Sequence, residues 1–373
     1  MGPPAFRGPL PDRSGRCRRQ DDGVIWKIAL RGRSRPREVG ARAAGTFAEP
    51  AKNPTAPEAT VKILVPDTIR LDVRPGPDDE VVVYDAASPF PPADTDAEVL
   101  VVWANTPDNL ADAARRLTSL RWVQTLAAGP DAVLAAGFGP RVTITSGRSL
   151  HDGPVAEHAL ALVLSMVRRL PGLGAAQRDH RWDTTVVRGQ SDPTTAGRFT
   201  LDGARVTVWG FGSIAARLAP LLAALGADVT GVASSRGERH GFPVVTDDDL
   251  PDVLARTDVL ISILPATPAT HHAFDAARID ELPDHAVFVN VGRGTTVDEG
   301  ALVAALQEGR LGGAALDVTE TEPLAAGSPL WDAPRLVLTP HVAGTRPQRA
   351  SELVDANLDA LVAGRPLRNV VPR

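Results

Sequence analysis

Three segments in the last quarter of the chain each place one polar or ionisable side chain after an apolar run. These side chains are Arg293 in VNVGRGT, Glu322 in ALDVTETEP and His341 in LTPHVAG. A guanidinium can hold a carboxylate and a neighbouring carbonyl together, because its planar fork donates to two acceptors at once. A carboxylate beside an imidazole stabilises the imidazolium, which can give a proton to a carbonyl oxygen. Singly, each residue fits a structural role, but together they indicate reduction of a 2-oxo acid or the reverse oxidation.

A glycine-rich turn some 80 residues upstream predicts a dinucleotide site. The segment GFGSIA (210–215) follows an apolar strand and opens a helical pattern. Gly210 permits the tight turn, and Gly212 lets the backbone approach a pyrophosphate. The free amides at the helix start would hold the phosphate, and they belong to Ser213 and Ile214.

The end of the next strand favours NADP over NAD. An NAD enzyme usually has Asp or Glu there, which bonds the ribose 2′-hydroxyl. This chain has Ala233, Ser234, Ser235 and Arg236 instead. Hydroxyl groups and a guanidinium suit the 2′-phosphate of NADP better than the 2′-hydroxyl of NAD. The alternative interpretation is that Arg236 is simply a solvated loop residue.

From residue 61 onward, short apolar runs alternate with helical stretches in two βαβ series, which is typical of doubly wound parallel sheets. An apolar helix at 152–172 and a polar, irregular stretch to about 200 separate the two series, and Pro220 is expected to kink the helix after the glycine turn. Buried strands are predicted at 61–66, 81–85, 99–103, 122–126, 142–145, 204–210, 228–234, 259–265, 286–292, 313–318 and 336–342, and further helices at 110–117, 213–226, 298–308 and 346–363.

Composition and charge indicate a globular protein and argue against a membrane-spanning or nucleic-acid-binding one. Apolar content of 43% and charged content of 23% are ordinary for a globular chain, and no apolar run is long enough to span a membrane. Residues 1–60 carry 12 Lys and Arg against 6 Asp and Glu, whereas the remainder carries 28 against 39. The acidic remainder argues against a nucleic-acid partner, and the basic head is predicted to be disordered. The single cysteine, Cys17, allows no intrachain disulfide and fits a cytoplasmic protein.

In combination and order, these motifs resemble the D-isomer-specific 2-hydroxyacid dehydrogenase family over about residues 61–373. The family includes phosphoglycerate dehydrogenases, glyoxylate/hydroxypyruvate reductases and D-lactate dehydrogenases. The matching segments are the glycine turn, N-x-x-R-G-T-x-V-D (290–298), A-L-D-V…E-P-L (315–324) and T-P-H-V-A-G (339–344).

The resemblance implies an α/β fold of two Rossmann-like domains with doubly wound parallel sheets, and a homodimer. The NAD(P)-binding domain, 201–342, would be inserted into a flavodoxin-like substrate domain made of 61–152 and 343–373. Residues 153–200 would form a linking helix and dimerisation stretch.

The resemblance also implies roles for single residues. Arg293 would orient the substrate, Glu322 would support the acid/base His341, and Asp317 would meet the nicotinamide carboxamide. The amides of Ala128 and Gly129 would bind the substrate carboxylate, and further cofactor contacts are implied at Pro265, Val291 and Gly344. Two departures from the family pattern are Pro130, which removes an amide from the substrate loop, and Ala215 in place of the third glycine.

The substrate and one alternative function stay open. The substrate is expected to be a small 2-oxo or 2-hydroxy acid, either glyoxylate/hydroxypyruvate-like or phosphoglycerate-like, with Arg148 as a candidate phosphate ligand. The alternative is a catalytically silent, NAD(H)-sensing regulatory protein of the corepressor type. Formate dehydrogenase, of similar fold, is disfavoured because that subgroup has Gln at the position of Glu322. No metal site is predicted, and five other histidines are expected to be structural or exposed, namely His151, His158, His180, His271 and His272.

Overall fold

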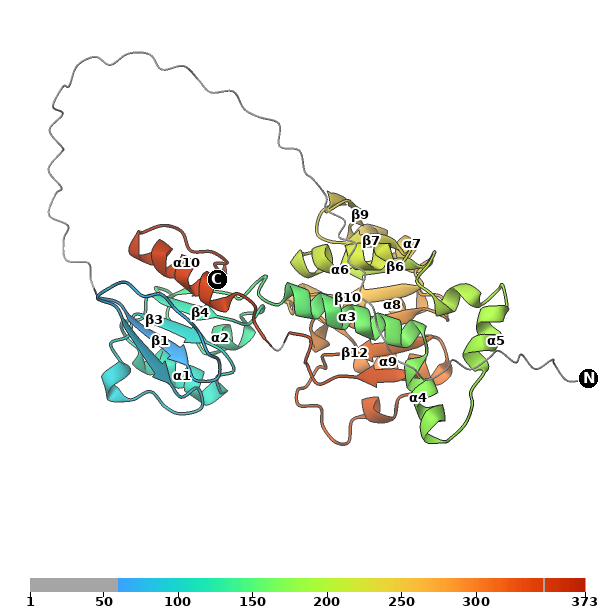
Figure 1. The fold of residues 1–373 in the computed structure, drawn as a ribbon, viewed down its shortest axis with the longest axis horizontal. Coiled ribbons are helices and arrows are strands. Elements are labelled where there is room, and N and C mark those ends of the chain that lie inside the picture. Colours follow the sequence, from blue (N-terminus) through green and yellow to red (C-terminus); the bar gives the residue numbers. More distant parts are fainter. Residues whose placement is uncertain (1–59, 345, 373) are drawn as a thin grey trace, which may run out of the picture. The chain divides into compact units, whose positions relative to one another are not determined.

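The structure is a computed structural model that describes residues 60–344 and 346–372. The basic head, for which disorder is predicted, lies outside the described residues apart from residue 60. The described chain forms two sheets with helices packed on them (Figure 1).

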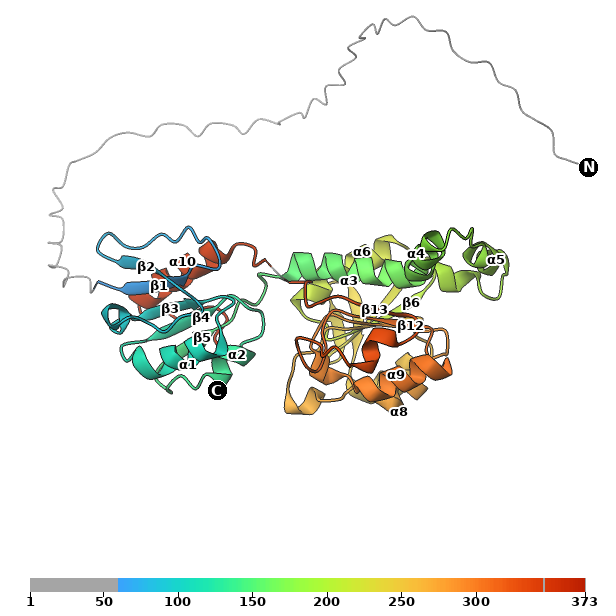
Figure 2. The same ribbon diagram turned by 90° about the horizontal axis from the view of Figure 1, so that it is seen from below.

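The first sheet has five parallel strands in the order β2-β1-β3-β4-β5. Its strands are β1 (Lys62–Pro66), β2 (Glu80–Tyr84), β3 (Val99–Val102), β4 (Trp122–Thr125) and β5 (Thr143–Thr145). The helices α1 (Pro107–Arg116) and α2 (Asp131–Ala135) belong to this part, and α10 (Ala350–Val362) returns to it from the C-terminal end. Val354 and Leu358 of α10 are buried with Ile63 and Trp122, and Figures 1 and 2 show α10 beside these strands.

The second sheet has eight strands in the order β13-β12-β11-β10-β6-β7-β9-β8. All neighbours are parallel except the β8–β9 hairpin. The strands are β6 (Arg205–Trp209), β7 (Asp228–Val232), β8 (Gly237–Arg239), β9 (Phe242–Val245), β10 (Val259–Ser262), β11 (Val287–Asn290), β12 (Gly313–Leu316) and β13 (Leu336–Leu338).

Helices cover both faces of this sheet, which explains why its central strands are continuous apolar runs. Figure 2 shows α3 and α6 on one face and α8 and α9 on the other. The helices of this part are α3 (Asp152–Val167), α4 (Leu170–Arg178), α5 (Thr185–Ser191), α6 (Ser213–Ala224), α7 (Leu250–Leu254), α8 (Ala276–Asp280) and α9 (Glu299–Glu308). Short 3-10 helices lie at Pro92–Asp94, Ala196–Phe199, Asp247–Asp249, Pro268–Thr270, Gly294–Thr296 and Pro329–Asp332.

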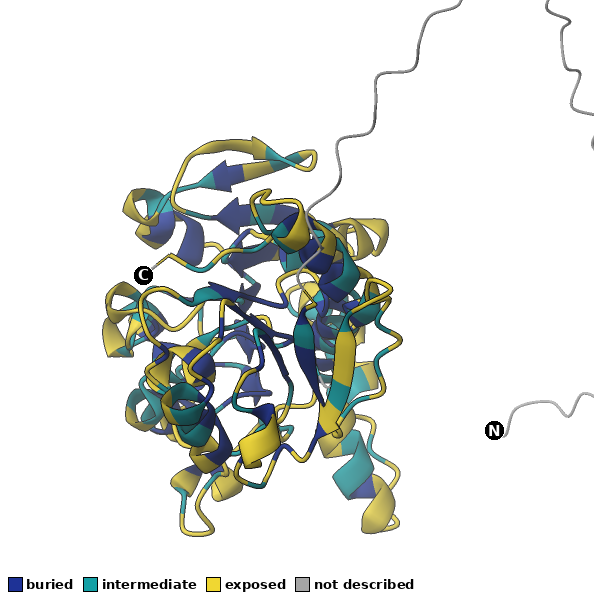
Figure 3. Cartoon of the chain, turned by 90° about the vertical axis from the view of Figure 1, so that its left-hand side faces the viewer, coloured by how far each residue is buried: buried dark blue, intermediate teal, exposed yellow. Residues whose placement is uncertain are grey.

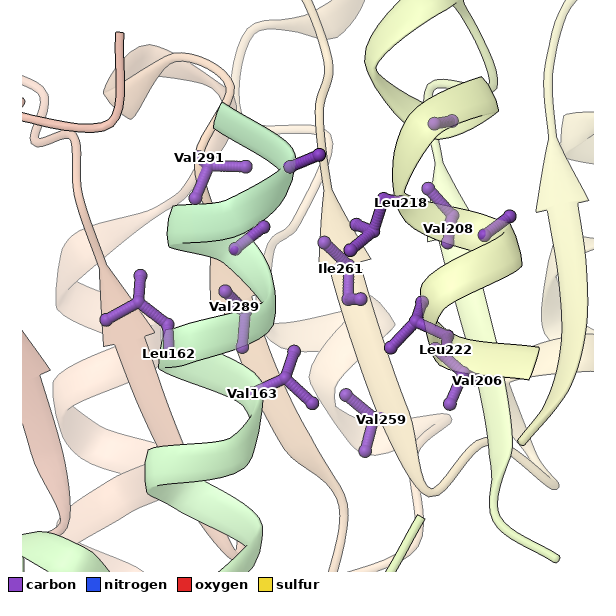
Figure 4. Close-up of a cluster of buried hydrophobic side chains, with 14 of the residues drawn as sticks. Leu162, Val163, Val206, Val208, Leu218, Leu222, Val259, Ile261, Val289 and Val291 are labelled. Carbon is purple, nitrogen blue, oxygen red and sulfur yellow. The ribbon is translucent and has the colours of Figure 1, made fainter. Parts of the chain in front are cut away.

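The main core lies between α3, α6 and the eight-stranded sheet. Val163 of α3 and Leu218 and Leu222 of α6 are fully buried against Ile261 and Val289 of the strands (Figure 4). Burying an aliphatic side chain of this size contributes roughly 1.5–3 kcal/mol. Figure 3 shows that the buried residues lie mainly in the strands and that the exposed residues lie on the outer surfaces of the helices. This packing fixes the carboxyl ends of the strands, where the predicted site residues lie.

Local signals set the helix ends. The carboxylate of Asp298 accepts a hydrogen bond from the amide of Ala301 and so caps the start of α9. Gly309 ends the same helix with a φ of 76°, a conformation that glycine adopts without strain. Pro220 lies inside α6, which nevertheless runs uninterrupted to Ala224; the expected kink produces no break in the helix.

The structure corrects three expectations. The predicted helix at 152–172 ends at Val167, because Arg169 adopts a left-handed φ of 56°, and Pro171 then lies in the first turn of α4. The stretch to about 200 is therefore partly helical. The strand predicted at 81–85 as buried is an edge strand, and Val83 is 66% exposed because only β1 pairs with it.

Several strands were predicted to end two to four residues too late. Those predicted at 259–265, 286–292 and 336–342 end at Ser262, Asn290 and Leu338. Their last residues leave the sheet as loops at its carboxyl edge.

Over residues 60–344 and 346–372, no single helix is long and apolar enough to cross a membrane. Only α3 and α4 taken together reach that length and apolarity, and they are bent by 64° at their junction.

Candidate active site

The glycine turn after β6 has the form that a pyrophosphate needs. Gly210 has a φ of 99°, and a Cβ there would lie 2.7 Å from the carbonyl oxygen of Ile263, so only glycine fits. A Cβ on Gly212 would meet nothing within 4 Å, and this residue offers no side-chain cap to α6. Within the described residues, the amides of Ser213 and Ile214 have no acceptor. These donors at a helix start therefore fit an anionic group.

The loop after β7 carries the hydroxyl groups and the arginine that were predicted to face a ribose 2′-phosphate. However, Arg236 is paired with a carboxylate, and a second arginine, Arg239, contacts this loop. Arg236 donates to Oδ1 of Asp249 at 2.5 Å. Arg239, in β8, donates to the Oγ of Ser235 at 2.6 Å and to the carbonyl oxygen of Phe211 in the glycine turn at 3.3 Å. Arg239 was not among the predicted site residues, because the β8–β9 hairpin was not predicted. Ser234 is exposed.

Arg293 follows β11 in a loop that its neighbours hold. The side chain of Asn290 accepts from the amide of Gly292 at 3.0 Å and donates to the carbonyl oxygen of Arg293 at 3.1 Å. The hydroxyl of Thr296 donates to the same carbonyl oxygen at 2.6 Å. Gly294 faces the backbone of Thr319 so closely that a Cβ would overlap it. The flanking residues thus fix the backbone from which the guanidinium extends.

The guanidinium of Arg293 reaches the loop predicted to bind a substrate carboxylate. Its Nε lies 3.5 Å from Oδ2 of Asp131, and a Cβ on Gly129 would overlap its Nη2. In the described part of the chain, the amides of Ala128 and Gly129 have no acceptor. Two segments more than 160 residues apart therefore present free donors to the same space.

His341 and Glu322 form the predicted pair. The imidazole Nδ1 lies 2.7 Å from Oε2 of Glu322, and the other carboxylate oxygen accepts from the amide of Thr319 at 3.0 Å. No described residue bonds Nε2 of His341. The side chain of His341 is half exposed, and its backbone has a left-handed φ of 51°. The ring is thus oriented by one nitrogen and free at the other.

Asp317 holds the loop that carries His341. It is 1% exposed, and its Oδ1 accepts from the Thr339 hydroxyl at 2.6 Å and from the Val342 amide at 2.9 Å. Its Oδ2 accepts from the amide of Ala343 at 2.9 Å. His158 was expected to be structural or exposed, and its Nε2 lies 3.3 Å from Oδ1 of Asp317. The predicted contact of Asp317 with a carboxamide stays a prediction.

A cavity of about 670 Å³ brings half of the predicted site residues together. Predicted substrate, proton-transfer and cofactor residues line it, namely Ala128, Gly129, Ile214, Val291, Arg293, Asp317, His341 and Gly344. Glu322 lies behind His341 in an adjoining apolar cavity of about 690 Å³. Ser234, Ser235, Arg236 and Pro265 line neither cavity. Over the described ranges, no three His, Cys, Asp or Glu side chains are grouped to hold a metal ion.

Comparison with known proteins decides the family. The family described as "D-isomer specific 2-hydroxyacid dehydrogenase, NAD binding domain" matches residues 160–343. A glycerate dehydrogenase of Methylorubrum extorquens is 31% identical over 271 residues, which are 70% of this chain and 82% of the relative. The chain belongs to the D-isomer specific 2-hydroxyacid dehydrogenase family.

Other members agree with this assignment. A glyoxylate/hydroxypyruvate reductase A of Salmonella newport is 32% identical over 289 residues, covering 74% of this chain and 86% of the reductase. A solved family structure from Aeromonas salmonicida has a TM-score of 0.70 at 30% identity, covering 84% of this chain and 99% of the other. One from Xanthobacter autotrophicus, in complex with NADPH and MES, has a TM-score of 0.68 at 31% identity and covers 84% and 98%.

This 2-hydroxyacid dehydrogenase is therefore an NAD(P)-dependent oxidoreductase acting on CH–OH donors. The predicted family and the predicted fold class of two Rossmann-like domains are confirmed.

Proposed function

We propose that this dehydrogenase reduces a small 2-oxo acid of the glyoxylate or hydroxypyruvate kind, with NADPH as the preferred cofactor. The observation that carries the proposal is that Arg293, Gly129 and His341 line one cavity. The relatives named glyoxylate/hydroxypyruvate reductase, one of them solved in complex with NADP and sulfate, support the substrate class.

Each side chain has a role that its contacts suggest. The amides of Ala128 and Gly129 bind the substrate carboxylate, and Arg293 donates to the carboxylate and to the carbonyl oxygen beside it. Glu322 accepts from Nδ1–H of His341 and stabilises the imidazolium, so Nε2 can give its proton to the carbonyl oxygen. In the oxidation direction the neutral ring takes the proton back. NAD(P), when bound, provides the hydride chemistry at the nicotinamide ring.

The cofactor would be held by three groups of residues. The glycine turn, with Gly210, Gly212, Ser213 and Ile214, would hold the pyrophosphate. Ser234, Ser235 and Arg236 would face the ribose 2′-phosphate, with Arg239 added because it already bonds Ser235. The nicotinamide end of the cofactor would be contacted by Pro265, Val291, Asp317 and Gly344.

Phosphoglycerate is the less favoured substrate. Arg148, the candidate phosphate ligand, does not line the 670 Å³ cavity, and its Nη2 lies 3.4 Å from Oδ1 of Asn369. The described residues that do line the cavity include only one arginine or lysine, Arg293.

We also propose a domain division and an assembly. The substrate domain would comprise 61–152 and 343–373, which the packing of α10 on the first sheet supports. The NAD(P) domain would comprise 201–342. Residues 153–200 would contact a second copy, since Leu170, Trp182 and Val187 are 52%, 93% and 61% exposed there. The single cysteine supports a cytoplasmic location.

The test is a substrate screen with the purified protein. NADPH and NADH oxidation would be followed with glyoxylate, hydroxypyruvate, pyruvate and longer 2-oxo acids. We expect turnover with the two- and three-carbon acids and a higher kcat/KM for NADPH. Tight NADPH binding without turnover of any 2-oxo acid would instead favour the silent regulatory alternative.

A further inference from the structure

The loop that carries His341 is held by Asp317. His341 has a left-handed φ of 51°, a conformation that a residue with a Cβ keeps only where its surroundings hold it there. The amides of Val342 and Ala343 donate to the two carboxylate oxygens of Asp317, each at 2.9 Å. The amide of His341 donates to the backbone carbonyl oxygen of the same aspartate at 2.7 Å. The position of the imidazole therefore follows the orientation of Asp317.

The hydroxyl of Thr339 connects this carboxylate to His158. An ionised carboxylate only accepts, so Thr339 donates its one hydroxyl hydrogen to Oδ1 of Asp317, which lies 2.6 Å away. Nε2 of His158 lies 3.0 Å from the same hydroxyl oxygen. Because that oxygen has no further hydrogen to give, Nε2 of His158 carries the ring proton and donates it. The three side chains thus form a chain of hydrogen bonds that runs from His158 to Asp317.

His158 belongs to α3, a helix that is packed into the main core. Its neighbours Ala159 and Leu162 are 0% and 5% exposed, and its own side chain is 22% exposed. His158 lines neither the 670 Å³ cavity nor the adjoining 690 Å³ cavity, whereas Asp317 lines both. An effect of His158 on the reaction must therefore pass through the residues that it contacts.

We propose that His158 is a positioning residue for proton transfer. Its Nε2–H fixes the hydroxyl of Thr339 and thereby the carboxylate of Asp317, which keeps His341 directed at the substrate carbonyl. Because α3 is part of the core, the donor is held by a rigid element and not by a loop. This inference rests on the proposed function, because it concerns the proton that His341 gives to the substrate.

Four variants test this chain of hydrogen bonds. His158→Leu removes the donor and keeps an apolar side chain of similar length, whereas His158→Gln retains an N–H near the position of Nε2. Thr339→Val removes the hydroxyl without changing the shape of the side chain. The fourth variant combines His158→Leu with Thr339→Val. The control is Glu157→Gln, at the exposed residue that precedes His158 on α3.

The measurements are kcat and KM for glyoxylate and for hydroxypyruvate with NADPH saturating. We expect His158→Leu to lower kcat about tenfold and to change KM by less than about threefold, because a displaced general acid slows the reaction more than it weakens substrate binding. His158→Gln should recover kcat to within about threefold of wild type. Thr339→Val and the double variant should each lose about tenfold, since two residues that act through one hydrogen bond do not have additive effects. Glu157→Gln should match wild type.

The thermal midpoint and the NADPH dissociation constant, measured by fluorescence, are recorded for every variant. If His158→Leu does not fold, Thr339→Val tests the same chain of hydrogen bonds from its other end, and an unchanged kcat there would overturn the inference.

Four other outcomes would also overturn it. One is an unchanged kcat in a folded His158→Leu variant. A loss of about a hundredfold in the double variant would show that the two residues act independently. Failure of His158→Gln to recover kcat would mean that the imidazole contributes by packing. Weaker NADPH binding with an unchanged kcat would assign His158 to the cofactor site. Wild-type protein that reduces no 2-oxo acid would instead refute the proposed function itself.

Discussion

At the scale of single residues, the free Nε2 of His341 is the atom on which proton transfer depends. His341→Ala should lower kcat for hydroxypyruvate reduction by about 10²- to 10⁴-fold, the usual contribution of a positioned general acid. NADPH binding should persist, because no predicted cofactor contact passes through the imidazole. Steady-state kinetics and a fluorescence titration measure the two effects. Full activity in His341→Ala would remove the acid/base assignment.

Gly129 tests the contact between the two segments that bind the substrate. In Gly129→Ala, the added Cβ would overlap Nη2 of Arg293 and lie 2.5 Å from Oδ2 of Asp131, so the guanidinium must move. We expect kcat/KM for the 2-oxo acid to fall by about 100-fold, because small displacements of a positioning group are costly. The NADPH dissociation constant should not change.

The matched control for this substitution is Gly327→Ala. A Cβ on Gly327 would meet nothing within 4 Å, and this loop residue lines neither cavity. Equal losses in the two alanine variants would mean that Gly129 has no special role in the substrate site.

The residues that could be predicted from the sequence share one property. Arg293, Glu322 and His341 each lie shortly after an apolar strand, and parallel strands bring their carboxyl ends to one edge of a sheet. His151 and His158 lie at a helix and contact residues such as Leu126 and Asp317, whose neighbourhood depends on tertiary packing. No spacing in the sequence predicts such contacts, so both histidines could be expected to be structural or exposed, but their partners could not be predicted.

At the scale of secondary structure elements, the β7 end and the β8–β9 hairpin set the cofactor preference. Arg239 reaches both the glycine turn and Ser235, whereas Arg236 is already paired with Asp249. Arg239→Ala should therefore lower kcat/KM for NADPH by about tenfold or more, the contribution of a charge-assisted hydrogen bond, and leave that for NADH nearly unchanged.

Arg236→Ala is the comparison for this prediction. Its effect should be smaller, because Asp249 already neutralises much of the Arg236 charge. If Arg239→Ala lowered kcat/KM equally for NADPH and NADH, the substitution would have a structural effect on the hairpin. That result would contradict a contact with the 2′-phosphate.

The presence of a strand was easier to predict than the residue at which it ends. The continuous apolar runs predicted the other strands of both sheets, but β8 and β9 went unrecognised because GERHGFPVV offers only the short run FPVV, which contains a proline. Strand ends were placed too late because residues such as Ile263 and Leu264 stay apolar beyond the sheet, where they pack against the glycine turn or the core. An apolar run indicates that residues are buried, but buried residues can also lie in a loop that follows a strand.

At the scale of the whole molecule, the exposed apolar side chains of α4, α5 and the loop between them predict self-association. Leu170, Trp182 and Val187 gain burial if a second copy covers them. Wild-type protein should sediment as a dimer, and Val187→Asp combined with Trp182→Ser should shift it toward the monomer. Sedimentation velocity measures this. A wild-type monomer at micromolar concentration would contradict the assembly.

The edge of the eight-stranded sheet opposite the site carries an ion cluster that should stabilise the fold without serving catalysis. Asp258, before β10, accepts from Arg205 of β6 at 3.0 Å and from His285 at 2.8 Å. Partial burial raises the pKa of this carboxyl, but the hydrogen bonds from Arg205 and His285 outweigh it and hold the pKa below its ordinary value. The ionised form is therefore favoured in the folded chain.

The direction of the pH dependence follows from that shift. A depressed folded-state pKa gives stability that is present above the unfolded value, about 3.9, and is lost as pH falls through the folded value. Asp258→Asn should lower the urea midpoint at pH 7, and its difference from wild type should shrink as the pH falls from about 5 to about 3. Its kcat at pH 7 should match wild type, because the cluster lies at the amino ends of the strands. A difference that is constant with pH would mean that Asp258 contributes through packing instead of charge.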